Sequence, residues 1–299
     1  FLGLAAGVGM AFFADYMDTS LTTPADVQRS LDLDQLAMFV HADSGPQKGK
    51  KRPVLASIED PDSPLTENFR TLRSGILFNP KFQDTRFLVV TSSVAREGKS
   101  TVGGNLAVVL AQAGKKVLLI DGDMRRPAVH GLFGMEKKPG LSEYLSGKEE
   151  FDALLQQSEV ENLQIMACGS SIEKPAELIG SNRERCEELI GASERFDYVV
   201  VDTPPLTLSD PTLLARSFGG SVLLVVRSGA VSRDVVQRSA NKLRAADAEL
   251  AGVLLNDFNL RKQGYYGYYY RYYDYYDRHY YYRSRKEKGK SKEKDKVAG

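Results

Sequence analysis

The sequence predicts an α/β fold in which a parallel β-sheet is covered by helices on both faces. Short runs of apolar residues, typical of strands that are buried on both sides, alternate along the chain with helical segments. These runs are residues 87–90, 116–120, 198–201, 221–226 and 252–256. Three of them are followed by a glycine-lysine-serine loop or by aspartates, and open parallel sheets bind ligands at the carboxyl ends of their strands.

The chain begins with an apolar, uncharged segment over residues 1–14. Because a helix needs about 20 residues to span a bilayer, we expect this segment to be the end of a transmembrane helix that starts in a longer chain. A buried helix or strand of a soluble domain is the alternative. Residues 15–52 are expected to form a juxtamembrane segment and linker, with a helix that Thr23 caps and Pro24 begins.

A helix is also expected over residues 63–78, with Ser63 as its N-cap and apolar residues at helical spacing. Glu67, Arg70 and Arg73 follow one another along its flank. They form either a solvated edge with local ion pairs or a contact between subunits, and the sequence favours neither. Further helices are expected over residues 102–113, 182–192, 210–215 and 232–246.

The loop over residues 91–101 reads TSSVAREGKST and lies between an expected strand and an expected helix. Its end, Gly98-Lys99-Ser100, places backbone N–H groups and an ammonium at a helix N-terminus, where phosphate anions bind well. The Ser100 hydroxyl is then placed to hold Mg²⁺. Ser93 and Arg96 stand where such loops usually carry glycine, which strains or reshapes the loop. The alternative is an ordinary turn with a serine that caps the helix.

Aspartates follow two further strands of the predicted sheet. Asp121 and Asp123 end the strand at residues 116–120, and Asp202 ends the strand at residues 198–201. Together with Lys99 and Ser100 they provide a lysine for phosphates, a hydroxyl for Mg²⁺ and carboxylates that hold a metal or accept a proton. The sequence therefore predicts a site for a nucleoside triphosphate.

Other site chemistries find no support in the composition. Cys168 and Cys186 form neither a disulfide framework nor a metal-ligand pattern, and the three histidines are not spaced as ligands. The formal net charge of +1 identifies no partner for the chain as a whole.

The C-terminal segment differs in kind from the rest of the chain. Its composition, tyrosine-rich and then lysine-rich, predicts a disordered tail. A segment that binds RNA or lipid through stacking and lysine charge is the alternative. The candidate phosphate acceptors are Tyr265, Tyr266, Tyr268, Tyr269, Tyr270, Tyr272, Tyr273, Tyr275, Tyr276, Tyr280, Tyr281 and Tyr282.

Five features together resemble the bacterial tyrosine kinases of polysaccharide export, the BY-kinases. They are the loop SSVAREGKST, the motifs VLLIDGDMRRP and VVVDTPP, the helix with Glu67, Arg70 and Arg73, and the tyrosine-rich tail. The resemblance implies a P-loop NTPase-like kinase domain over residues 53–262 and a tyrosine-cluster and lysine-rich tail over residues 263–299. It also implies an ATP-dependent enzyme that phosphorylates its own tail in trans.

The resemblance assigns roles to the residues of the site. Lys99 would cradle the β- and γ-phosphates, and Asp121 and Asp123 would serve the metal and the incoming tyrosine, with Asp121 the better candidate for the base. Asp123 and Asp202 would hold Mg²⁺ with Ser100. The ATP-binding set would be Arg96, Glu97, Gly98, Lys99, Ser100, Thr101 and Asn256.

The resemblance also implies partners and a location. Glu67, Arg70 and Arg73 would join unphosphorylated subunits in a ring, which negative charge on several phosphotyrosines would break up. The ring would regulate polysaccharide chain length and export at the bacterial inner membrane, with the kinase domain in the cytoplasm. Other expected partners are protein tyrosine substrates, a tyrosine phosphatase and the export machinery; no specific nucleic acid is expected.

Two rival functions share these residues. An ATPase of the partition and septum-site type has the same fold, but its second loop lysine is missing here, where Val94 stands. A catalytically weak or inactive scaffold that assembles with nucleotide is the other rival, because the loop lacks glycines.

Overall fold

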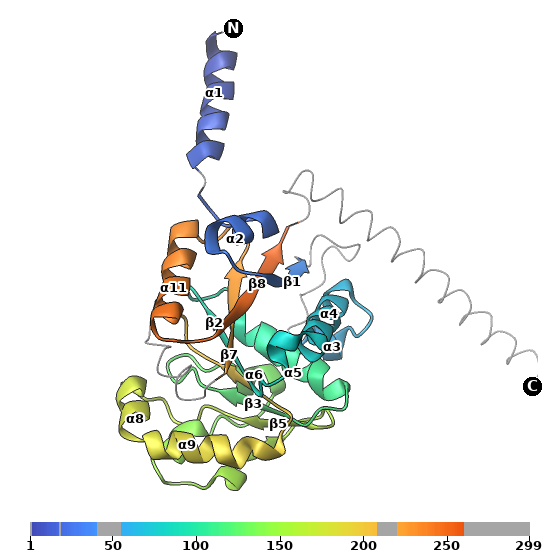
Figure 1. The fold of residues 1–299 in the computed structure, drawn as a ribbon, viewed down its shortest axis with the longest axis vertical. Helices are drawn as coiled ribbons and strands as arrows, with labels where there is room; N and C mark the ends of the chain where they lie inside the picture. Colours follow the sequence, from blue (N-terminus) through green and yellow to red (C-terminus); the bar gives the residue numbers. More distant parts are fainter. Residues whose placement is uncertain (1, 18, 41–54, 208–219, 260–299) are drawn as a thin grey trace, which may run out of the picture.

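The computed structural model describes residues 2–17, 19–40, 55–207 and 220–259. Eight strands form one sheet in the order β1-β8-β7-β2-β6-β3-β5-β4, and all neighbours are parallel except β4 and β5 (Figure 1). The strands are β1 (Gln35–Val40), β2 (Phe87–Ser92), β3 (Val117–Asp121), β4 (Leu155–Gln157), β5 (Leu163–Met166), β6 (Tyr198–Asp202), β7 (Ser221–Arg227) and β8 (Leu250–Phe258). The predicted parallel sheet is confirmed, with one antiparallel strand added at an edge.

All five predicted strands are present, and three others were not predicted. The strands β4 and β5 have only three and four residues, too few to show a pattern in the sequence. The strand β1 lies in the segment that the sequence analysis assigned to the juxtamembrane region and linker, yet it pairs with β8. The sheet therefore begins earlier in the chain than the sequence indicated.

The predicted helices that lie among the described residues begin and end close to the expected positions. The helices of the described residues are α1 (Leu2–Met17), α2 (Pro24–Leu31), α3 (Ala56–Glu59), α4 (Pro64–Phe78), α5 (Lys99–Gln112), α6 (Val129–Phe133), α7 (Leu141–Leu145), α8 (Pro175–Ser181), α9 (Arg183–Ala192) and α11 (Arg233–Ala245). Of these, the short helices α3, α6, α7 and α8 were not predicted. Both predicted N-caps are confirmed: the side chains of Thr23 and Ser63 accept the N–H groups of Asp26 and Thr66. The helix expected over residues 210–215 lies outside the described residues.

Helices cover both faces of the sheet, as the continuous apolar runs predict. Within β2, Leu88 and Val90 face the core beneath α4 and α5, whereas Phe87 and Val89 contribute to cores on the opposite face. That face is covered by α9 near β3 and β6, and by α2 and α11 near β7 and β8. Alternate residues of a strand point to opposite faces, so a strand between two helical layers has to be apolar at every position.

The N-terminal helix α1 extends away from the sheet (Figure 1). Four of its apolar side chains are exposed, among them Leu4 at 73% and Met10 at 70%. Among the described residues, no helix is long and apolar enough to cross a membrane.

After α1, the chain is attached to the sheet: Leu21 is buried, donates its N–H to Val231 O at 2.9 Å, and accepts the N–H of Gly229 at 2.9 Å. Burying a leucine side chain contributes about 1.5–3 kcal/mol.

Candidate functional site

The strand order brings the predicted site residues to one edge of the sheet. The strand β6 lies between β2 and β3, so its last residue, Asp202, is flanked by the loop after β2 and by the end of β3. In the register of the sheet, Asp202 is opposite Asp121 on one side and Val90 on the other. The two acidic motifs and the phosphate loop therefore meet, as the sequence predicted for parallel strands.

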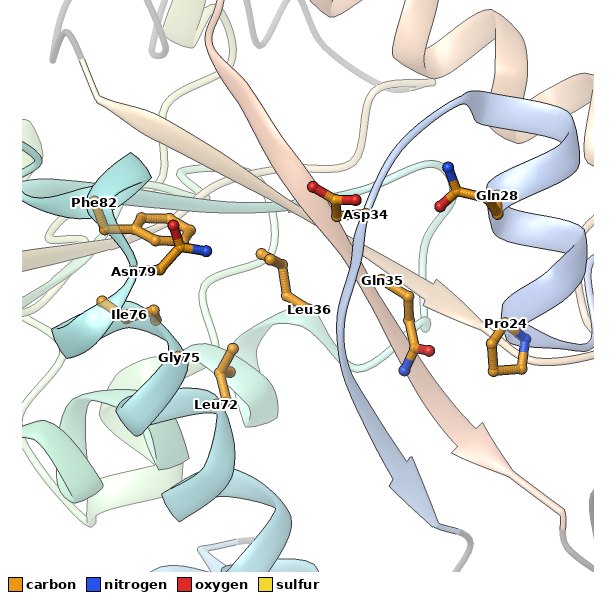
Figure 2. Close-up of a pocket in the computed structure, with 10 residues that line it drawn as sticks. All are labelled: Pro24, Gln28, Asp34, Gln35, Leu36, Leu72, Gly75, Ile76, Asn79 and Phe82. Atoms are coloured by element: carbon orange, nitrogen blue, oxygen red, sulfur yellow. The ribbon is translucent and has the colours of Figure 1, made fainter. Parts of the chain in front are cut away.

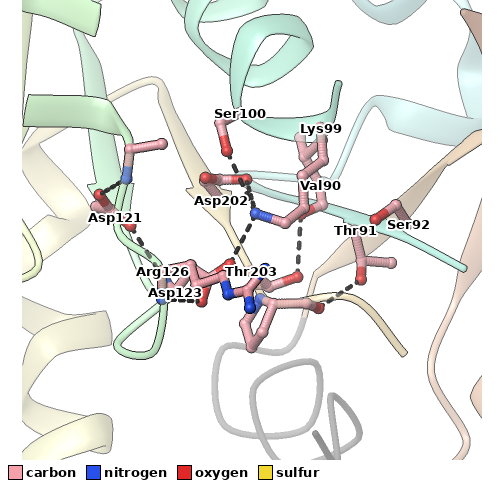
Figure 3. A network of polar contacts seen from close by, with 12 residues as sticks. Val90, Thr91, Ser92, Lys99, Ser100, Asp121, Asp123, Arg126, Asp202 and Thr203 are labelled. Carbon is pink, nitrogen blue, oxygen red and sulfur yellow. Dashed lines mark hydrogen bonds and ion pairs between the residues drawn. The ribbon is translucent and has the colours of Figure 1, made fainter. Parts of the chain in front are cut away.

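Lys99 is the centre of this cluster (Figure 3). Its Nζ lies 2.9 Å from Asp123 Oδ2 and 3.5 Å from Asp202 Oδ1, and it donates to Ser100 Oγ at 3.3 Å. Burial alone would lower the pKa of the Lys99 ammonium, but the carboxylates of Asp202 and Asp123 hold it above its ordinary value. The lysine is therefore a permanent cation at the start of α5, where phosphate binding needs one.

Asp202 is fully buried, and the Lys99 ammonium, 3.5 Å from its Oδ1, is the charged partner of its carboxylate, which makes no closer hydrogen bond among the described residues. Its backbone oxygen accepts the N–H of Gly122 at 2.8 Å, which fixes the end of β6 against the loop after β3. Burial raises the pKa of Asp202, although Lys99 counteracts this effect. Lys99 compensates this buried carboxylate only from 3.5 Å, so its oxygens can still accept a closer cation and fit the role of Mg²⁺ ligands.

Asp121 makes three hydrogen bonds to backbone N–H groups. Its Oδ1 accepts from Asp123 at 3.2 Å, and its Oδ2 accepts from Ala128 and Val129 at 3.0 Å each. Burial, with a smaller contribution from the Asp202 charge, raises the pKa of Asp121 to about 7. A carboxyl group with a pKa in this range suits a general base at neutral pH.

Asp123 continues the same loop. Its Oδ1 accepts the N–H of Arg126 at 3.0 Å, so that Oδ2 is left facing Lys99. The loop after β3 is thereby folded by its own aspartates, and both side chains remain at the site (Figure 3).

The phosphate loop carries its strain at one of the two expected positions. Arg96 has a φ of 68°, in the left-handed region that favours glycine, at a cost of about 1–2 kcal/mol. Ser93 is not among the residues with positive φ, so the missing glycine at that position costs no such strain. Gly98 has a φ of 91°, and a Cβ there would lie 2.2 Å from Asn256 Nδ2. Gly98 is therefore required both by its backbone and by the close approach of Asn256.

The first turn of α5 presents its backbone donors at the site. Val102 N–H is bonded to Gly98 O at 2.9 Å, and the N–H groups of Lys99, Ser100 and Thr101 precede it. In an α-helix these first N–H groups have no acceptor within the helix. They are the groups that an anion at this helix start would engage.

Two residues of the predicted ATP-binding set, Glu97 and Asn256, form hydrogen bonds that support the backbone of the phosphate loop. Asn256, on β8, donates its Nδ2 to Glu97 O at 2.8 Å. The Glu97 carboxylate accepts the backbone N–H groups of Val94 and Arg227. Sequence reasoning gave no indication of this arrangement, because Arg227 and Asn256 follow the loop by more than 120 residues.

Thr203 was also missed as a site residue. Both its N–H and its Oγ1 donate to Val90 O at 3.0 Å, and Thr91 Oγ1 donates to Pro204 O at 3.1 Å (Figure 3). These bonds attach the segment after β6 to the strand that leads into the phosphate loop. The threonine directly after the strand-end aspartate was the signal available in the sequence.

The residues expected at subunit contacts lie on α4. Glu67 and Arg70 form an ion pair with each other, one turn apart on the helix, and both are partly exposed. Arg73 Nη1 donates to Val109 O of α5 at 3.3 Å. The local ion pair on the flank of α4 is therefore present in the single chain. The candidate phosphate-accepting tyrosines, in residues 265–282, lie outside the described residues.

A separate hollow of about 510 Å³ lies beside β1, between α2 and α4 (Figure 2). Its lining is Pro24, Gln28, Asp34, Gln35, Leu36, Leu72, Gly75, Ile76, Asn79 and Phe82. The lining includes no predicted site residue and no basic side chain to attract phosphates. Within the part of the chain that the structure describes, no group of three or more His, Cys, Asp or Glu side chains is arranged to hold a metal ion.

Comparisons with known proteins agree with this geometry. A family model described as an AAA domain matches residues 92–253. The tyrosine-protein kinase YwqD of Bacillus subtilis is 37% identical over 220 residues, which are 73% of this chain and 92% of YwqD. The tyrosine-protein kinase Etk of Escherichia coli K12 is 36% identical over 220 residues; they are 73% of this chain but only 30% of Etk. The solved kinase domain of Escherichia coli ETK superposes with a TM-score of 0.71 at 28% identity, over 80% of this chain and 95% of that domain.

Proposed function

We propose a function for this chain from one premise: it belongs to the family of bacterial tyrosine-protein kinases. In our proposal it transfers the γ-phosphoryl group of ATP to tyrosine hydroxyls of its own C-terminal tail. The observation that carries the proposal is the cluster of Lys99, Asp123 and Asp202 at the edge of the sheet, in a chain that has a tyrosine-rich segment at residues 265–282.

ATP would bind with its β- and γ-phosphates against Lys99 and the N–H groups of the first turn of α5. Mg²⁺ would be held by Ser100, Asp202 and Asp123, a set of hard oxygen donors that suits this cation. The bound ion would neutralise charge on the phosphates. The complete burial of Asp202, whose closest charged partner among the described residues is Lys99 at 3.5 Å, supports this assignment.

Proton transfer in this mechanism falls to Asp121. A tyrosine oxygen forms a bond to the γ-phosphorus, the bond from that phosphorus to the β,γ-bridging oxygen breaks, and ADP leaves. The tyrosine proton passes to the Asp121 carboxylate. The raised pKa of Asp121, about 7, favours this role because such a carboxylate accepts a proton near neutral pH. Its three backbone hydrogen bonds would also hold the carboxylate in place.

Transfer in trans requires subunits to assemble, and we propose the flank of α4 as the contact. Glu67 and Arg70 have 38% and 31% of their side-chain surface exposed, so they are accessible to a neighbouring subunit. Each phosphotyrosine adds a charge of about −1.5 to −2, so a heavily phosphorylated tail would repel its neighbours and open the ring.

We propose that the kinase works in polysaccharide export at the bacterial inner membrane. There it would regulate chain length through ring assembly and disassembly, and a tyrosine phosphatase would reset it. The apolar, exposed helix α1 supports attachment through an upstream membrane segment. The chain spans only 30% of Etk, so the setting of the whole protein is itself part of this proposal.

The test combines two forms of the full chain. Unlabelled wild type is mixed with ¹⁵N-labelled Lys99→Met, ATP and Mg²⁺ are added, and the tail peptides are analysed by mass spectrometry for phosphotyrosine. We expect phosphate on wild-type tails and on labelled tails, because an inactive subunit receives phosphate only in trans.

The other outcomes separate the parts of the proposal. Phosphate on unlabelled tails alone would refute transfer in trans. A wild type that binds ATP but leaves every tail unmodified would refute the kinase proposal. That result would favour a nucleotide-dependent scaffold, for which the strained backbone at Arg96 is the supporting observation.

A further inference from the structure

Glu97 is a buried carboxylate inside the phosphate loop, with 2% of its surface exposed. Its Oε2 accepts the N–H of Val94 at 2.8 Å, and its Oε1 accepts the N–H of Arg227 at 3.0 Å. One carboxylate thus joins the start of the phosphate loop to the last residue of β7. Both of its oxygens are engaged by the protein itself.

The backbone of Glu97 is held as well. Asn256 Nδ2 donates to Glu97 O at 2.8 Å, so β8 holds the main chain of this residue while β7 holds its side chain. The residues on either side, Arg96 and Gly98, both have left-handed backbones, with φ of 68° and 91°. Glu97 therefore lies between two left-handed residues and is fixed in place by two strands.

This arrangement argues against direct contact between the Glu97 carboxylate and a nucleotide. A carboxylate offers only acceptors, as phosphate oxygens do, and like charges repel. Burying a carboxylate costs free energy unless hydrogen bonds compensate for it, and here backbone N–H groups provide that compensation. Burial raises the pKa of Glu97 to about 7, although the N–H groups of Val94, Arg227 and Ser93 oppose the shift. A group retained at this cost indicates a role in shaping the loop.

We propose that Glu97 is a positioning residue for phosphoryl transfer: its carboxylate, bridging the N–H groups of Val94 and Arg227, holds the phosphate loop in the curvature that directs the first N–H groups of α5 at the phosphates. This inference rests on the proposed nucleotide site. It assigns Glu97 to the support of the loop, whereas the sequence grouped it with residues that bind ATP.

The test measures the affinity of the full chain for ATP and for AMP in the presence of Mg²⁺. Glu97→Gln keeps the shape of the side chain but points an amide NH₂ at one of the two backbone donors. We expect about tenfold weaker ATP binding and an equal rise in KM for ATP, with AMP affinity changed less than about twofold. The loss is confined to ATP because the loop holds the outer phosphates.

Two further variants complete the design. Arg227→Ala is the matched control: it removes the ion pair of that side chain with Asp257 but retains the backbone N–H that Glu97 accepts. We expect its ATP affinity within about twofold of wild type. Glu97→Asp keeps the charge on a side chain one methylene shorter, which cannot reach both donors, and we expect an intermediate loss. It replaces the glutamine variant if that protein does not fold.

The outcomes are distinguishable. A wild type that does not bind ATP would refute the nucleotide site itself. Wild-type ATP affinity in both Glu97 variants would overturn the positioning role alone. Equal losses for ATP and AMP, or the same loss in Arg227→Ala, would also overturn it, since the effect would then come from general loosening of the strand ends.

Discussion

Removing the ammonium of Lys99 should destabilise the protein in a way that depends on pH. In Lys99→Met, the carboxylates of Asp123 and Asp202 lose the cation that lies 2.9 Å and 3.5 Å away, and both are almost completely buried. Removing one partner of a buried ion pair typically costs about 3–5 kcal/mol, because the remaining charge is left uncompensated. We expect a loss of this size at about pH 8 in the absence of Mg²⁺.

The same variant should recover part of its stability in acid. Burial already raises the pKa of Asp202, and without the lysine that opposes this shift the carboxylate takes up a proton more readily, so the loss of stability should be smaller at about pH 6 than at about pH 8. Urea unfolding at the two pH values, with EDTA present, measures the difference directly. Lys174→Met is the control, because Lys174 pairs with Glu177 on the surface, with 69% of its side chain exposed. We expect it to change stability by less than about 0.5 kcal/mol at either pH.

A second variant tests the cause. Adding Asp202→Asn to Lys99→Met removes one of the unpaired charges, so the double variant should be more stable than the single variant at about pH 8. An equal loss at both pH values, or no gain from the second change, would refute the argument from uncompensated charge. The result also matters for activity assays, because Lys99→Met has to be compared at a pH where it is folded.

Three further predictions follow from the site. Because burial raises the folded-state pKa of Asp121 to about 7, the folded protein binds that proton more tightly than the unfolded chain does. Thermal stability should therefore fall as the pH rises from about 5 to about 8, and Asp121→Asn should make the dependence of the melting temperature on pH flatter. Gly98→Ala should lower both stability and ATP affinity, since its Cβ would meet Asn256. The control is Gly114→Ala: Gly114 has a φ of 80° and open space around it, so this change should cost only about 1 kcal/mol of backbone strain. Equal effects of the two changes would contradict the importance of the contact between residue 98 and Asn256. Arg96→Gly should relieve left-handed strain and raise the free energy of unfolding by at most about 1 kcal/mol, measured as a slightly higher urea midpoint. A lower midpoint would show that the arginine side chain contributes more than its backbone costs.

The sequence alone predicted the central strands and the meeting of most of the candidate site residues at one edge of the sheet. The runs at residues 87–90 and 198–201 are apolar at every position because helices cover both faces, and that pattern is visible without a structure. The site motifs were equally visible, because each stands directly after a strand. In a parallel sheet the carboxyl ends of the strands share one edge, so the convergence of Lys99, Asp121 and Asp202 followed from the fold class.

The tertiary structure decided the order of the strands and the support of the loop. Nothing local to β6 says that it lies between β2 and β3, yet this position is what buries Asp202 between the other two motifs. Likewise, Glu97 finds its partners on β7 and β8, which pack beside the loop only in the folded sheet. Local sequence patterns indicate which elements form and which of their faces are apolar. Contacts between segments that are distant in sequence depend on how those elements pack, and their packing is determined by the chain as a whole.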